Sequence, residues 1–138
     1  MLVEKKRRRE ELVHTLPASK HPQTLFIITI YQLKMFMESL IFNRLIDIVT
    51  EESGHNKKSI LGSNHAAELT DARTIASYFL YFKIGYNTPC IARLMNLSVS
   101  GVCYLLQRVE SRRRQSFVFR SLMDRIGQRI SQEIIDSG

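Results

Sequence analysis

The stretch from residue 88 to 107 constrains the fold of this 138-residue chain most, because it meets the steric demands of a helix-turn-helix. Asn96 falls where the turn needs a left-handed backbone, which costs least for Gly or Asn. Ser98 follows as a good N-cap for the second helix. Apolar or small residues occupy the positions where the two helices meet each other and a core. They are Ile91, Ala92, Met95, Leu97, Val102 and Leu105.

The remaining sequence is also typical of helices, because apolar residues recur every three or four positions. Residues 24–52 fit one long helix or two end to end, although Leu25 to Tyr31 would also suit a strand. Further helices are expected over 57–61, from a cap at Ser63 or Asn64 to Lys83, and over 116–136 behind Ser116. We therefore predict an all-α helix-turn-helix bundle of about six helices. Residues 23–138 would form a single domain, with its core motif at 88–107 and a C-terminal helix at 116–136.

Residues 1–22 are polar, contain Pro17 and Pro22, and carry the basic run Lys5 to Arg9. We predict a flexible basic N-terminal arm there. The basic run has three interpretations: a solvated helix face, an arm that binds DNA phosphates, or a targeting signal. The apolar helix before residue 45 and the C-terminal helix supply more apolar surface than a helix-turn-helix alone can cover. Either a larger single core or a homodimer face would use that surface.

The charge favours a polyanionic partner, because 20 Lys and Arg residues face 13 Asp and Glu residues and give a net charge of +7. Nucleic acid is the first expectation and a membrane surface the second. Lys34 and Glu38 interrupt the longest apolar stretch, so we expect a buried helix or strand there and no membrane span. Two cysteines, Cys90 and Cys103, do not suggest a disulfide framework. A cytoplasmic location without a membrane partner is therefore predicted.

The second helix of the motif would present a reading surface toward DNA. Our base-contact candidates are Val99, Ser100, Tyr104, Gln107 and Arg108. Because that surface carries one cation, flanking residues would have to bind phosphates. Our phosphate candidates are Arg73, Arg93, Arg112, Arg113, Arg114 and Ser98. For Arg112 to Arg114 a solvated helix end that offsets the helix dipole is the alternative interpretation.

From about Ile46 to Val109 the sequence resembles the C-terminal DNA-binding domain of the bacterial replication initiator DnaA, which has a Trp repressor-like plan. The matching stretches are Ile46-Asp47-Ile48-Val49, Asn56-Lys57-Lys58-Ser59-Ile60-Leu61, Asp71-Ala72-Arg73-Thr74-Ile75-Ala76 and Asn87-Thr88-Pro89-Cys90-Ile91-Ala92-Arg93. The family signature Gly-Arg-Asp-His-Thr-Thr-Val is replaced by the sequence Asn96-Leu97-Ser98-Val99-Ser100-Gly101-Val102. The Arg-Asp-His part that reads the initiator's box is missing. The resemblance therefore implies a DNA-binding fold and not initiator function.

No residue pattern predicts catalysis. The histidines His14, His21, His55 and His65 are scattered, none is spaced i, i+4 from another, and no Cys-x-x-Cys occurs. We therefore expect no enzyme activity, no cofactor, no metal and no small-molecule substrate. The predicted function is duplex DNA binding in transcriptional, mobile-element or replication control. The alternative is a helical protein-interaction or dimerisation module that does not bind DNA.

Overall fold

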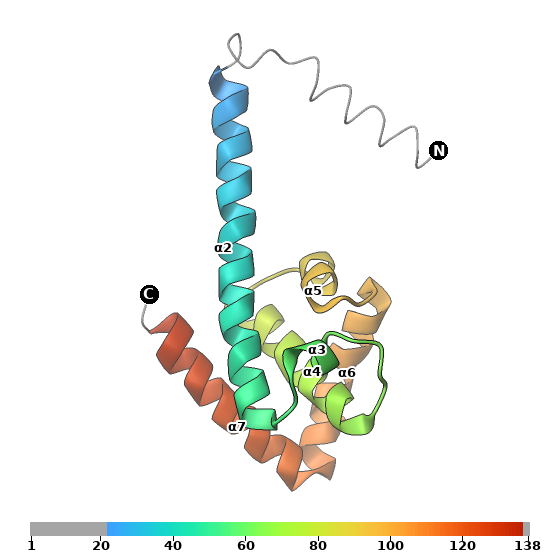
Figure 1. Cartoon of the computed structure of the whole chain (residues 1–138). Coiled ribbons are helices and arrows are strands. Elements are labelled where there is room, and N and C mark those ends of the chain that lie inside the picture. The colour runs from blue at the N-terminus through green and yellow to red at the C-terminus, as the bar shows by residue number, and fades with distance from the viewer. Residues whose placement is uncertain (1–21, 137–138) are drawn as a thin grey trace, which may run out of the picture. The chain divides into compact units, whose positions relative to one another are not determined.

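The computed structural model describes residues 22–136, and these residues form six α-helices and no strand, which confirms the all-α prediction (Figure 1). The expected arm at residues 1–22 lies outside the described residues except for Pro22. Two helices end in a π-helical turn, named η1 and η2. The elements are α2 (Pro22–Ser53), α3 (Lys57–Ile60), α4 (Ala67–Phe79), η1 (Leu80–Ile84), α5 (Thr88–Met95), α6 (Val99–Gln115), α7 (Phe117–Ile130) and η2 (Ser131–Ile135).

The chain divides into two units, Met1–Glu38 and Ser39–Gly138. The described part of the first unit is the first half of α2, and the sequence prediction of a buried helix or strand is wrong there. The segment is helical throughout, and its large apolar side chains are exposed, with Phe26 67% and Tyr31 65% accessible. A long apolar stretch is usually buried against other atoms, but the described residues of this chain do not bury this one.

Length and composition alone would allow one described helix, α2, to cross a membrane. The bent pair α5 and α6 passes the same test only if it is taken as one broken span. A signal sequence near an N-terminus passes the same test, as does the mostly buried core helix of a soluble protein, so the presence of this helix alone establishes no location.

The core of the second unit combines the second half of α2 with α4, α5, α6 and α7. In this unit α4 and α5 both pack against α6 (Figure 1). The C-terminal helix belongs to the same core, which favours the larger-core interpretation for its apolar side. It contributes Phe119, Met123, Ile126 and Ile130. Gly127 lets α7 approach α4 closely, because a Cβ there would lie 3.0 Å from the Phe79 ring.

The helix ends follow local capping chemistry, with one departure from the sequence prediction. Gly54 and Gly85 have φ values of +79° and +88°, in the left-handed region that ends a helix at little cost for glycine. Ser116 accepts a hydrogen bond from the Phe119 amide at 3.1 Å, as predicted for the start of α7. The predicted side-chain cap of α4 is wrong. The Asn64 side chain instead accepts from the Ala66 amide at 3.0 Å and shapes the preceding loop.

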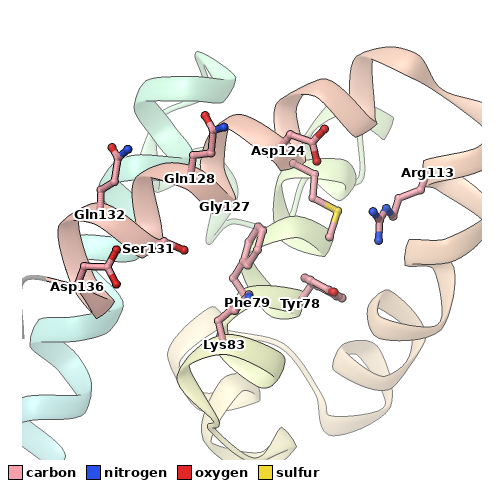
Figure 2. Close-up of a pocket in the computed structure, with 11 residues that line it drawn as sticks. Tyr78, Phe79, Lys83, Arg113, Asp124, Gly127, Gln128, Ser131, Gln132 and Asp136 are labelled. Carbon is pink, nitrogen blue, oxygen red and sulfur yellow. The ribbon is translucent and has the colours of Figure 1, made fainter.

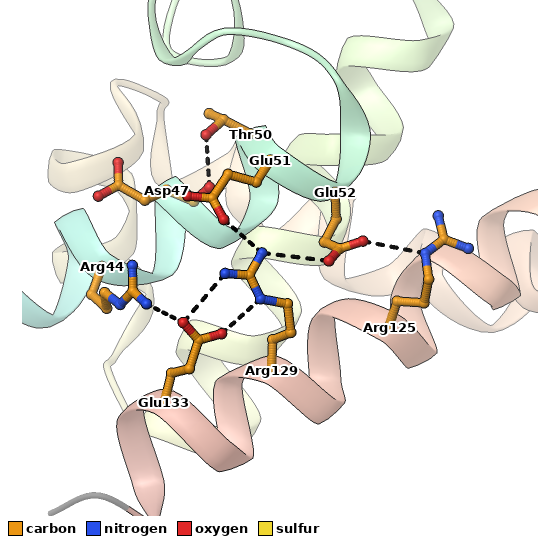
Figure 3. Close-up of polar contacts among 8 residues, drawn as sticks. All are labelled: Arg44, Asp47, Thr50, Glu51, Glu52, Arg125, Arg129 and Glu133. Carbon is orange, nitrogen blue, oxygen red and sulfur yellow. Dashed lines mark hydrogen bonds and ion pairs between the residues drawn. The ribbon is translucent and has the colours of Figure 1, made fainter.

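Ion pairs join the second half of α2 to α7 and η2 (Figure 3). Arg129 lies 2.7 Å from a Glu51 carboxylate oxygen and 2.6 Å from a Glu133 carboxylate oxygen. Arg44 also pairs with Glu133, and Glu52 accepts from Arg125 at 3.3 Å. The hydrogen bonds from Arg129 lower the pKa of Glu133, and the same contacts raise the pKa of Arg129.

The lowered pKa of Glu133 predicts an acid-sensitive contribution to stability. Because the folded-state pKa lies below the ordinary glutamate value, the contribution is complete above that value and is lost as pH falls through the lower folded-state pKa. We expect Glu133→Gln to lower the melting temperature at neutral pH and to have little effect once Glu133 is protonated in both states. Thermal unfolding followed by circular dichroism across this pH range checks the result. Glu110→Gln, at an exposed position of α6, is the matched control, and an equal pH dependence of its effect would contradict the assignment.

Candidate nucleic-acid interface

Helices α5 and α6 have the geometry of a helix-turn-helix. Their axes are bent by 102°, and only residues 96–98 connect them. Asn96 has φ 57° and ψ 46°, the left-handed conformation expected for the turn. Its amide and that of Leu97 both donate to the Ala92 carbonyl, the latter at 2.9 Å. The turn is therefore formed by the residues that the sequence indicated.

Two side-chain caps and a buried seam fix the motif. The Asn87 side chain accepts from the Cys90 amide at 3.0 Å, and the Ser98 hydroxyl accepts from the Gly101 amide at 3.0 Å. The residues predicted to join the two helices are buried, apart from the half-buried Leu97. This rigidity suits a binding motif, because side chains on a fixed helix need little ordering when they meet a partner.

The first half of α6 presents a continuous exposed face. Ser100, Tyr104 and Gln107 follow one another at i, i+4 and i+7, so they lie on one side of the helix, and all three are exposed. Val99 at the helix start is also exposed. Tyr104 is 61% accessible. Four of the five base-contact candidates thus lie where a partner can reach them.

Arg108, the fifth candidate, is corrected by the structure. Its Nη1 donates to the Thr74 hydroxyl at 2.9 Å, and its Nη2 lies 3.3 Å from Asp71 on α4. Its side chain is only 19% exposed. Arg108 therefore turns toward α4 and away from the exposed face. Because residues 99–107 of α6 contain no Lys or Arg, that face has no cation of its own.

Asp71 also holds Arg112, so this phosphate candidate is corrected too. Arg112 donates Nε at 3.1 Å and Nη2 at 2.8 Å to the two carboxylate oxygens, a bidentate pair. The hydrogen bonds to Asp71 raise the pKa of Arg112. Its guanidinium also lies 5.6 Å from the centre of the Phe119 ring. Arg112 therefore connects α4, α6 and α7 within the second unit.

Arg73 cannot bind phosphate, because it is buried and its donors are engaged. Its guanidinium donates to four carbonyl oxygens, two at the end of α3 and two in the loop that follows, and Arg73 is 4% exposed. The distances are 2.6 Å to Ile60, 2.6 Å to Asn64, 3.0 Å to Ser59 and 3.0 Å to Gly62. Burial lowers the pKa of Arg73. The sequence prediction therefore misplaced this residue, which acts from inside the fold.

Through these bonds Arg73 positions the loop of residues 61–66 beside the motif. The Asn96 side chain donates to the Leu61 carbonyl at 3.2 Å, so the turn and the loop are tied together. A cavity of about 350 Å³ lies between them, lined by Gly62, His65 and Tyr104 among others. The exposed residues Ser63 and His65 line this cavity beside α6, and neither was among the DNA-contact candidates chosen from the sequence.

The other phosphate candidates are accessible to different degrees. Arg93 and Arg114 are exposed, and Arg93 also lies 3.7 Å from the Cys90 sulfur. Arg113 is half-buried and lies 3.8 Å from Glu110. Ser98 is exposed, although its hydroxyl oxygen already accepts the cap hydrogen bond.

A larger cavity of about 680 Å³ lies among η1, α6 and α7, next to Arg113 (Figure 2). Lys83 and Arg113 contribute positive charge to its lining, whereas Asp124 and Asp136 contribute negative charge. The mixed charge does not define one class of ligand. Within residues 22–136 no three His, Cys, Asp or Glu side chains are grouped to hold a metal ion.

Comparison with known proteins gives no relative for this chain. No family model, no curated protein and no solved structure matches it.

Proposed function

We propose that this protein binds duplex DNA through α5 and α6. The observation that carries the proposal is the 102° bend between two capped helices, with an exposed polar face on the second helix. A major groove about 12 Å wide admits a helix presented in this way. The resemblance to the DnaA C-terminal domain and the net charge of +7 support the same proposal. A role in transcriptional, mobile-element or replication control forms part of it.

In this proposal the exposed face of α6 reads bases and the surrounding residues bind the backbone. Ser100 and Gln107 would hydrogen-bond base edges, Val99 would contact a thymine methyl, and Tyr104 would reach a base or a phosphate. Arg93, Arg113, Arg114 and Ser98 remain as phosphate contacts. The corrected roles of Arg73, Arg108 and Arg112 leave fewer cations near α6, so we propose modest affinity for each copy of the motif.

Removal of the positive charge at position 114 tests the phosphate assignment. We expect Arg114→Gln to weaken binding to all duplexes alike and to reduce the slope of log affinity against log salt by about 1. Fluorescence anisotropy over a salt series measures both quantities. Lys83→Gln removes the same charge from η1, beside the larger cavity. An equal loss in that control would show a net-charge effect only, and would contradict a local contact by Arg114.

A protein-interaction or dimerisation module is the second candidate. The exposed apolar half of α2 favours it, as does the absence of a cation on residues 99–107 of α6. An apolar partner surface would bind without losing affinity as salt rises, whereas phosphate contacts weaken with salt. The salt dependence of binding therefore separates the two candidates.

We also propose a cytoplasmic protein without catalytic activity and without a membrane span. Lys34 lies near the middle of the apolar part of α2, and Glu38 follows one turn later. At the centre of a bilayer a lysine costs about 2.5–3.5 kcal/mol, whereas each Leu, Ile or Phe contributes only about −0.3 to −0.6 kcal/mol. The two charges therefore offset much of the gain from the apolar residues.

A further inference from the structure

A single carboxylate on α4, that of Asp71, holds two arginines of α6. Arg112 donates Nε and Nη2 to its two oxygens, at 3.1 and 2.8 Å, and Nη2 of Arg108 lies 3.3 Å from one of them. Nη1 of Arg108 also donates to the Thr74 hydroxyl at 2.9 Å. Two positive charges therefore meet one negative charge, and the cluster keeps a positive charge beside the proposed DNA interface.

The two arginines continue the line of the proposed reading face along α6. Tyr104, Arg108 and Arg112 are spaced four residues apart, so their side chains leave the helix along one line, with a rise of about 6 Å at each step. Phosphates line both edges of the groove that a reading helix enters. A guanidinium freed from Asp71 would therefore lie near phosphates when Tyr104 contacts the DNA.

The cluster is partly open to solvent. The side chains of Asp71, Arg108 and Arg112 are 17%, 19% and 27% exposed, and a cavity of about 410 Å³ is lined by Asp71 and Arg112. Helices α4 and α6 also contribute buried apolar residues to one core, among them Ala72 and Val109. The guanidinium groups can therefore turn toward solvent without unpacking the two helices.

We propose that Asp71 competes with DNA phosphates for Arg108 and Arg112, and so limits the sequence-independent affinity of the motif. The inference rests on the proposed DNA function. A carboxylate and a phosphate accept the same bidentate hydrogen bonds from a guanidinium, so an arginine held by Asp71 is not available to the DNA backbone. Each phosphate contact that is withheld lowers the slope of log affinity against log salt by about 1. Asp71 thus accounts for the modest affinity proposed for each motif.

A purely structural role for Asp71 predicts the opposite result. A carboxylate that only fastens α6 to α4 would, when neutralised, loosen the reading helix and weaken its binding to every duplex. A carboxylate that withholds cations would, when neutralised, strengthen the binding to every duplex. The sign of the change in affinity therefore separates the two roles.

Neutralisation of Asp71 tests the proposal, by fluorescence anisotropy with random and selected duplexes over a salt series. We expect Asp71→Asn to raise the affinity for both duplexes about threefold to tenfold at low salt, and to steepen the slope by about 1 to 2. The ratio of the two affinities should stay the same, because phosphate contacts do not distinguish sequences. Asp71→Glu keeps the negative charge and should keep the original slope. Circular dichroism checks that each variant is folded.

Asp47→Asn is the matched control, because it makes the same chemical change at an exposed position of α2. An equal gain there would show an effect of net charge and would overturn the proposal, as would a folded Asp71→Asn variant whose affinity stays the same or falls. Arg108→Gln leaves the pair of Asp71 with Arg112 in place and should leave the slope unchanged. A slope lower by about 1 would show that Arg108 already binds a phosphate, which overturns the proposal even if Asp71→Asn does not fold.

Retention on heparin, a sulfated polyanion without bases, separates this proposal from the proposed function. Asp71→Asn should need a higher salt concentration for elution than the unaltered protein and Asp47→Asn. Absence of duplex binding by the unaltered protein at low salt would contradict the proposed function, whereas the heparin comparison would still decide whether Asp71 withholds the two cations. Equal elution of Asp71→Asn and Asp47→Asn would overturn that inference.

Discussion

Arg73→Met is expected to lower the free energy of unfolding by about 2–4 kcal/mol. The guanidinium supplies hydrogen bonds to four backbone carbonyls, at Ser59, Ile60, Gly62 and Asn64. Methionine fills much of the volume but donates no hydrogen bond, so four carbonyls lose the hydrogen bond from Arg73, and only that of Ser59 keeps a backbone donor, the Gly62 amide, among those hydrogen bonds. Thermal unfolding by circular dichroism should show a melting temperature lower by about 10 °C or more.

The matched control is Arg114→Met, which makes the same chemical change at an exposed position. We expect that variant to stay within about 0.5 kcal/mol of the unaltered protein. A similar melting temperature for the two variants would show that the hydrogen bonds of Arg73 do not stabilise the loop of residues 61–66. DNA binding by Arg73→Met, measured well below its melting temperature, should also fall, because the loop adjoins Tyr104 across the smaller cavity.

Alanine substitution of Tyr104 or Gln107 is expected to reduce discrimination between a selected DNA site and a random duplex. A well-placed side chain contributes about 1–3 kcal/mol of discrimination, so each variant should lose about 5- to 150-fold in the affinity ratio. Binding to random duplex should change little, because phosphate contacts remain. Anisotropy titrations of the two duplexes at one salt concentration give the ratio directly.

Gln115→Ala, at the far end of α6, is the control, because it is exposed and lies outside the proposed reading face. It should leave the ratio unchanged. A uniform loss for Tyr104→Ala or Gln107→Ala across all sequences would assign those residues to the backbone and not to bases. A loss of equal size in Gln115→Ala would remove the distinction between the two parts of the helix.

The helix-turn-helix could be predicted from the sequence because local sterics determine it. A left-handed turn residue, an N-cap and a small residue at the crossing leave few alternatives, and Asn96, Ser98 and Ala92 meet these demands within one short segment. Each requirement depends on neighbours along the chain. The structure therefore confirms the turn, the cap and the buried seam where the sequence indicated them.

The roles of the arginines could not be predicted in the same way, because they depend on residues far away in sequence. Asp71 forms ion pairs with both Arg108 and Arg112. Asp71 and Arg112 are separated by 41 positions in the sequence. A basic side chain near a recognition helix has the same sequence pattern whether it faces solvent or an acid on a neighbouring helix. The role of Arg73 could not be predicted either, because it donates to backbone carbonyls, and every residue type has one.

The exposed half of α2 shows a different limit. A run of apolar residues predicts a buried surface, but it does not show whether that surface is buried by the same chain or by a partner. The apolar side of α7 is buried in the core of the second unit, whereas residues 25–37 are exposed.

The central claim is sequence-specific duplex binding, and a titration of labelled random duplex at two salt concentrations, followed by selection of bound sequences, tests it most directly. Our account predicts binding that weakens steeply as salt rises and an enriched motif whose preference depends on Tyr104 and Gln107. Absence of binding at low salt, or binding that salt leaves unchanged, would contradict it.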